Sequence, residues 1–332
     1  MQTFVRQSFK FRCACSVFIF LAFVLYSCDE DGLAPDENTI GFAPRISDYN
    51  IFMGDPSALK PSEGFELYEL STELFSDYAR KQRLIKLPSG TTMHALGEGL
   101  PEFPDSTILV KTFYYFNDAR DTAKGRRILE TRLIVKAQQK WNVATYVWNE
   151  EQNDALLLTT GVNTTVNWID EKGKGKVVSY HIPSNRECAS CHNLSGSVLP
   201  IGPKLRNLNI NVWRSSGLVN QLSYFVSLGT LDQVDPAQVE TLPKWDDTSL
   251  DLEGRARAYL DVNCAHCHSK NGHAIDSNLL LNYEVPFSET RIQNRKGAIH
   301  KQMREGEMPQ IGTTVVHEEA VELIRSYIET LN

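Results

Sequence analysis

The spacing of hydrophobic residues follows two different periods along the chain. Between residues 106 and 182, segments rich in Val, Ile, Thr, Tyr and Trp alternate with short sequences of turn-forming residues. This pattern predicts an antiparallel meander of about six strands. The expected strands are 107–116, 127–137, 141–149, 155–160, 165–169 and 176–182.

Elsewhere the apolar residues recur at intervals of three and four, as on one face of a helix. The expected helices cover 67–81, 251–263 and 317–331, and another carries Leu218, Leu222 and Phe225 on one face. Residues 232–250 are acidic, contain two prolines and form the best boundary between domains. The sequence therefore predicts the α+β class, with an antiparallel β-sheet domain over 61–240 and an all-α domain over 241–332.

The N-terminus has the order of a secretory signal. Residues 1–12 carry three basic residues and no acidic one, and residues 13–26 are almost wholly apolar. The run ends in Ser27-Cys28 and resembles a bacterial lipoprotein signal, which implies cleavage before Cys28 and acyl chains on that residue. An uncleaved anchor helix is the alternative. We expect a signal peptide over 1–27, a lipid anchor to the membrane at Cys28, a polar tether over 28–60, and a location in the cell envelope as an outer-membrane or periplasm-facing lipoprotein.

Composition narrows the classes of protein and partner. The chain has 332 residues, of which 42% are apolar and 23% charged, as in globular proteins and unlike disordered or multi-span membrane chains. The formal charge is −7, and it becomes −10 without residues 1–27, with 31 basic against 41 acidic residues. Since no stretch gathers a basic face, we expect no nucleic-acid partner. Acidic charge instead favours a positively charged protein as the docking partner.

The cysteines are spaced as haem-attachment motifs rather than as a disulfide framework. Cys13 and Cys15 fall within the predicted signal and Cys28 carries the lipid, so four of the seven cysteines remain. They form two C-x-x-C-H sequences, whose thiols suit the two vinyl groups of one porphyrin and whose imidazole suits its iron. A zinc site would need all four sulfurs or further histidines at finger spacing, and a thioredoxin-like pair needs no following His. We therefore expect two covalently attached c-type haems, with thioether bonds at Cys188, Cys191, Cys264 and Cys267, and iron ligands at His192 and His268. His266 occupies a spacer position inside the second motif.

The last ninety residues resemble a known haem domain. Residues 241–332 are similar to a class I cytochrome c domain, with a helix holding Gly254, the second motif, a late Met308-Pro309 and a C-terminal helix. The resemblance implies that Met308 is the sixth ligand of the second iron and that Gly254 allows close approach of Tyr327. The competing ligands for this iron are His273, His300 and Met303.

The upstream region resembles the β-sheet haem domain of the cytochrome c′-β superfamily. The similarity is carried by Phe103-Pro104-Asp105, residues 108–111, Trp141 and the first motif. It implies a first haem lying against the sheet, with a distal face lined by apolar side chains such as Phe113 or Trp141 and no strong sixth ligand. His94 is the competing ligand. Residues 58–332 together resemble a family of dihaem c-type cytochromes.

Electron transfer between redox partners is the leading functional prediction, because His-Met ligation raises a haem's potential and leaves no open site on the iron. The alternative is a haem redox enzyme, or a sensor of nitric oxide, peroxide or hydroxylamine, acting at the first haem. A surface-binding β domain with haems as structural staples is a third interpretation. An electron carrier is favoured over an enzyme.

Overall fold

The computed structural model describes residues 40–331. Its largest element is a six-stranded antiparallel sheet in which every strand pairs with its neighbours in the sequence. The α+β class is therefore confirmed, and four of the six predicted meander strands, β3 to β6, lie in this sheet. The strands are β1 (Glu66–Leu67), β2 (Arg80–Lys86), β3 (Ile108–Phe116), β4 (Arg126–Ala137), β5 (Lys140–Trp148) and β6 (Ala155–Leu158).

The last two predicted strands leave this sheet. They are β7 (Val162–Ile169) and β8 (Gly175–Ile182), which pair only with each other as a separate hairpin. The hairpin packs its inner side chains, including Val166 and Tyr180, into a cluster with Phe113 and Tyr115 of the sheet. The sheet still has six strands, because β1 and β2 pair at its other edge.

The helix predicted over 67–81 is wrong. This region contains the end of β1, an irregular segment and the start of β2. Its apolar residues have helical spacing, but they pack against separate neighbours: Leu70 joins the cluster around Leu205, and Leu74 joins that around Leu242. Long-range packing thus overrides a short local periodicity.

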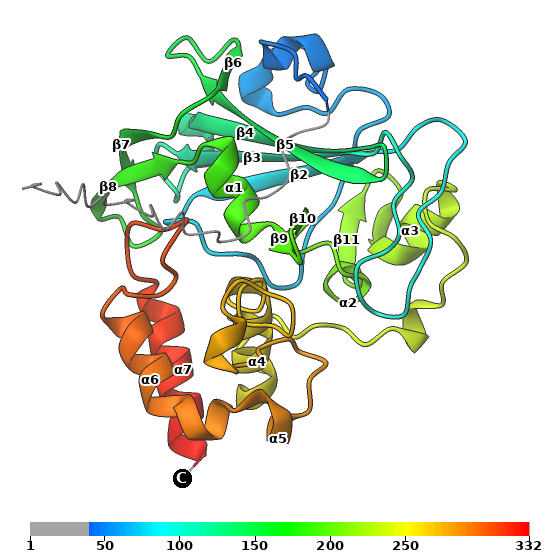
Figure 1. Cartoon of the computed structure of the whole chain (residues 1–332). Helices are drawn as coiled ribbons and strands as arrows, with labels where there is room; N and C mark the ends of the chain where they lie inside the picture. Colours follow the sequence, from blue (N-terminus) through cyan, green and yellow to red (C-terminus); the bar gives the residue numbers. More distant parts are fainter. Residues whose placement is uncertain (1–39, 332) are drawn as a thin grey trace, which may run out of the picture. The chain divides into compact units, whose positions relative to one another are not determined.

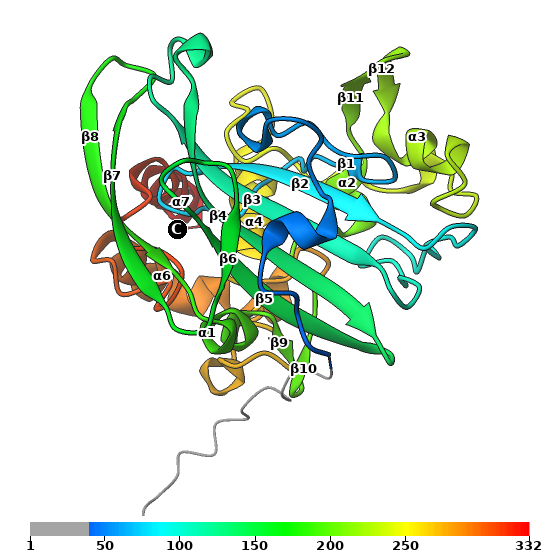
Figure 2. The ribbon, with the colours of Figure 1, turned by 90° about the horizontal axis from the view of Figure 1, so that it is seen from above.

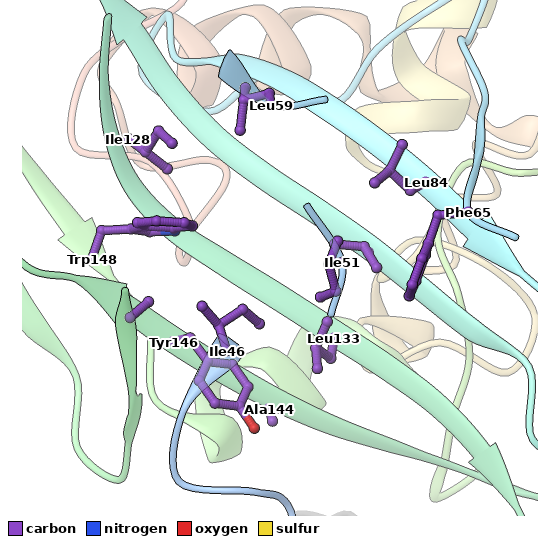
Figure 3. Packing of buried hydrophobic residues seen from close by; sticks show 12 residues of the cluster. Ile46, Ile51, Leu59, Phe65, Leu84, Ile128, Leu133, Ala144, Tyr146 and Trp148 are labelled. Carbon is purple, nitrogen blue, oxygen red and sulfur yellow. The ribbon is translucent and has the colours of Figure 1, made fainter. Parts of the chain in front are cut away.

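One face of the sheet is covered by the N-terminal part of the described chain. Ile46, Ile51 and Leu59 are buried there together with Leu133 and Trp148 from the strands. Figure 2 shows this segment lying across the strands, and Figure 3 shows the side chains that fill the cluster. The tether predicted over 28–60 therefore does not describe residues 40–60, whose apolar side chains serve as core.

The connecting segments and the C-terminal helices lie on the opposite side of the sheet (Figure 1). Helices α4 and α7 confirm the predictions over 251–263 and 317–331. The helices are α1 (Asn185–Cys191), α2 (Leu205–Leu208), α3 (Gln221–Ser227), α4 (Leu252–Asn263), α5 (Phe287–Thr290), α6 (Ile292–Arg304) and α7 (Glu318–Thr330). Two small hairpins are β9 (Asn193–Leu194) with β10 (Ser197–Val198) and β11 (Asn211–Arg214) with β12 (Gly217–Asn220), and short 3-10 turns occur at Ile46–Tyr49, Pro56–Ala58, Thr122–Lys124, Pro236–Gln238 and Ile275–Ser277.

The predicted signal peptide and Cys28 lie outside the described residues. Within residues 40–331, no helix is long and apolar enough to cross a membrane.

Replacing Ile51 by Ala tests whether the N-terminal segment is part of the core. Ile51 is 1% exposed, so the truncation should lower the free energy of unfolding by about 2–4 kcal/mol. Met53, which is 48% exposed in the same segment, is the matched control, and Met53→Ala should change stability by less than about 0.5 kcal/mol. Denaturant unfolding measures both, and equal small effects would show that residues 46–59 are not packed on the sheet.

Candidate functional site

The first motif begins directly after the β7–β8 hairpin. Ser184 caps helix α1, because its hydroxyl accepts from the backbone N–H of Glu187 while the Glu187 carboxylate accepts from the N–H of Ser184 at 2.8 Å. The capped helix turns Cys188 onto the sheet, where its buried sulfur lies 3.5 Å from the hydroxyl of Thr145 on β5. Burial raises the pKa of the Cys188 thiol.

His192 ends helix α1 with its imidazole held in one orientation. Its Nδ1 lies 2.8 Å from the carbonyl oxygen of Leu199. A carbonyl only accepts, so Nδ1 carries the proton and Nε2 keeps its lone pair. Burial also lowers the pKa of His192 to about 3, which keeps the ring neutral. A neutral imidazole with a fixed tautomer is the form that ligates iron.

A cavity lies between His192 and the sheet. Its walls combine the first motif, the strands of the sheet and a proline-rich turn. They are formed by Tyr68, Leu109, Val110, Lys111, Arg132, Leu133, Ile134, Val143, Ala144, Cys188, His192, Pro200, Ile201 and Pro203.

The residues expected on the distal face of the first haem lie beside this cavity rather than in its lining. Trp141 packs against the cluster containing Cys188, and Phe113 is fully buried beneath the β7–β8 hairpin. His94, the competing ligand, is 63% exposed and sits 3.4 Å from the carboxylate of Asp232. The structure therefore does not bring His94 to the first motif.

The second motif follows the end of helix α4. The Nδ1 of His268 lies 3.0 Å from the hydroxyl oxygen of Ser277, whose own proton is donated to the carbonyl of Ala274 at 2.7 Å. The hydroxyl therefore accepts from Nδ1, and Nε2 again keeps its lone pair. Burial lowers the pKa of His268. Both motif histidines thus have the same tautomer, each fixed by a hydrogen bond from within its own loop.

The two motifs lie side by side. The thiol of Cys191 interacts with the thiol of Cys267 and with the imidazole of His266. This contact with Cys267, together with burial, raises the pKa of Cys191 to about 12. The following loops also meet, since the N–H of Ser195 donates to the carbonyl of Asn271 at 3.4 Å. His266 therefore lies between the motifs, with a buried Nδ1 that has no hydrogen-bond partner.

Met308 lies in the loop between α6 and α7 and is half-buried. The competing Met303 is buried in the helical core, on α6. Figure 1 shows the α6–α7 loop and the end of α4 on the same side of the helices, facing the sheet. The carboxylate of Asp77 fixes this loop by accepting from the N–H groups of Thr314 at 2.8 Å and Val315 at 3.2 Å.

The close approach expected between Gly254 and Tyr327 does not occur in this form. A side chain on Gly254 would meet Asp251 and Pro243, because this glycine faces the start of its own helix. Tyr327 is buried in a cluster that contains the small residue Ala256 instead. The helices α4 and α7 still pack against each other, but through the face of α4 that carries Ala256, Tyr259 and Leu260.

His317, at the start of α7, is a partly buried residue that the sequence did not single out. Its ring stacks on Phe75 at 4.0 Å between centroids, and its Nδ1 lies 3.0 Å from the hydroxyl of Tyr259. Burial lowers the pKa of His317 to about 4. The residue thus links the α6–α7 loop, helix α4 and the segment before β2.

The four motif cysteines, Cys188, Cys191, Cys264 and Cys267, are free thiols. Within residues 40–331, no group of three or more His, Cys, Asp or Glu side chains is arranged to hold a metal ion. Each motif instead offers two thiols and one oriented imidazole, as thioether attachment and iron ligation require.

Comparison of the chain with family models, curated proteins and solved structures found no match.

The lowered pKa of His317 predicts a specific acid destabilisation. Its ordinary pKa of 6.5 falls to about 4 in the fold, so the unfolded chain binds the extra proton first. Stability is complete above about pH 6.5 and should fall between pH 6.5 and 4, by at most about 1.4 kcal/mol per pH unit. Denaturant unfolding should show a smaller loss over this range for His317→Gln than for the parent. The matched control is His94→Gln at an exposed position, and an equal loss in parent and His317→Gln would refute the assignment.

Proposed function

We propose that this chain is a dihaem c-type cytochrome that transfers electrons between redox partners in the cell envelope. One observation carries the proposal: two C-x-x-C-H motifs, each with its imidazole fixed through Nδ1, lie in direct contact through Cys191 and Cys267. Haems bound at these motifs would supply reversible one-electron chemistry at neighbouring centres. The contact gives electrons a short route through the protein.

The protein's own residues would keep these centres rigid. Leu199 and Ser277 fix the two imidazoles, and the Asp77 anchor restricts the loop that carries Met308. A fixed ligand shell changes little when the iron changes charge, which favours rapid electron exchange. On this proposal Met308 and His268 would be the protein ligands of the iron held at the second motif.

The lipid anchor and the acidic charge complete the proposal. Acylation at Cys28 would hold the protein at a membrane, and the charge of −10 after cleavage would favour a basic redox partner.

A second candidate, a haem enzyme or small-ligand sensor, is favoured by the cavity at the first motif. Its lining contains His192 but no methionine and no second histidine. A haem bound there would keep an open or easily displaced sixth position. Binding of carbon monoxide at the first haem separates this candidate from a pure carrier.

Haem counting tests the proposal directly. The purified chain should hold two haems through denaturation in acid acetone, since thioether bonds survive it. Replacing both Cys188 and Cys191 by Ser should remove one haem, and the matched pair at Cys264 and Cys267 should remove the other. Pyridine haemochrome spectra and intact mass give the count, and a parent chain with fewer than two haems would contradict the proposal.

Met308→Ala should abolish the weak near-infrared band of an iron–thioether bond and lower the midpoint potential of one haem. Met303→Leu, which changes a buried methionine on α6, is the matched control and should keep the band. A band that persists in Met308→Ala but disappears in Met303→Leu would reassign the ligand.

A further inference from the structure

Basic side chains form a row across the sheet on the face that carries the first motif. In the strand register, Arg83 of β2 is opposite Lys111 of β3, and Lys111 is opposite Arg132 of β4. Arg132 is in turn opposite Thr145 of β5, whose hydroxyl contacts the sulfur of Cys188. With about 4.8 Å between neighbouring strands, the row extends about 14 Å from the attachment cysteine.

The carboxylates in this row do not balance its positive charge. Glu130 pairs with Arg132 at 2.7 Å, and Glu73 pairs with Arg83 at 3.0 Å. For Lys111, none of the carboxylates within residues 40–331 lies inside 4 Å of the ammonium group, which instead sits 4.9 Å from the centre of the Phe113 ring.

A second observation is an unsatisfied donor atom in the row. The side chain of Arg83 is 4% exposed, and its Nη2 is buried without a hydrogen-bond acceptor. Burial, and then the charges of Arg83 and Lys81, lower the pKa of Lys111 well below its ordinary value. Unpaired buried donors and charges are costly, so this row is arranged for an anion.

We propose that the row of Arg83, Lys111 and Arg132 binds the propionate carboxylates of the first haem. This inference rests on the proposed function. A porphyrin attached through its vinyl-derived carbons carries its propionates on the opposite edge, and two of the three cations, Lys111 and Arg132, line the cavity beside His192. A porphyrin attached at Cys188, next to Thr145 at one end of the row, would have its carboxylates on the side of the cations. They supply the negative charge that the row lacks.

The site also tunes the first haem. Cations beside the propionates oppose the extra positive charge of ferric iron and therefore favour the reduced state. The row raises the potential of this haem while leaving the second haem unaffected, because the charge pairing is local.

Lys111→Met in the full, haem-loaded chain tests the site. At a fixed applied potential, the ratio of reduced to oxidised first haem should fall about tenfold, equivalent to a midpoint about 59 mV lower for a one-electron couple. The matched control is Lys86→Met, since Lys86 lies on the opposite face of the sheet, 4.8 Å from the Phe65 ring centre. Its removal should leave both midpoints unchanged.

Resonance Raman spectra give a second readout that does not need Lys111→Met to fold. The propionate bending bands of one haem should differ between the parent and Lys111→Arg, and Lys86→Arg should leave them unchanged. Two haems with parental midpoints in Lys111→Met, or with parental propionate bands in Lys111→Arg, would overturn the site alone. A parent chain with fewer than two haems would overturn the proposed function and this site together.

A dissolved carboxylate is the other source of the same charge. Acetate titrated into the parent protein should leave both midpoints unchanged, because the propionates already occupy the row. A shift on addition of acetate in the parent that is absent from Lys111→Met would assign the row to a soluble anion and refute the propionate site.

Discussion

The buried backbone of residues 71–78 has no regular secondary structure, so its polar groups must find partners elsewhere. Asn207 bonds both the N–H and the carbonyl of Thr72, and the side chain of Asn263 accepts from the N–H of Phe75. Asn263 is the last residue of α4, next to the second motif, and Asp77 holds the α6–α7 loop. One irregular segment thereby joins the sheet to the C-terminal helices and brings the two motifs together.

Local patterns in the sequence explain the part of the fold that could be predicted. Strands β3 to β8 could be predicted from β-branched and aromatic residues between turn residues, and helix α7 from apolar residues on one face, of which Ala320, Ile324 and Tyr327 are buried. The helix predicted over 67–81 was wrong because Leu70 and Leu74 fit a helical spacing but pack near Leu205 and Leu242, more than 100 residues away. The prediction of a tether was wrong for residues 40–60 because the segment is mostly polar, and its few apolar residues did not indicate that they are buried.

Part of the candidate site could likewise be predicted from the sequence, and part could not. The cysteines and histidines of the motifs could be proposed as haem-binding residues because thioether attachment imposes a strictly local spacing. The contact between Cys191 and Cys267 depends on tertiary docking and leaves no trace in the sequence. The basic row could be predicted in part. Lys111 is two residues from Leu109, and Arg132 is two residues from Ile134, so each charged residue shares the inward face of a predicted strand with an apolar one. Such inward charges indicate a ligand or a buried pair, but only the register shows that they align.

The burial of the motif sulfurs also constrains how such a protein is made. Cys188 is closed in against the sheet, and Cys191 faces Cys267 across the junction of the two motifs. On the two-haem proposal, the Cys188 sulfur would no longer be accessible to a maturation enzyme once helix α1 had packed on the sheet, so attachment at Cys188 would precede that packing. The first haem would then be loaded before folding is complete.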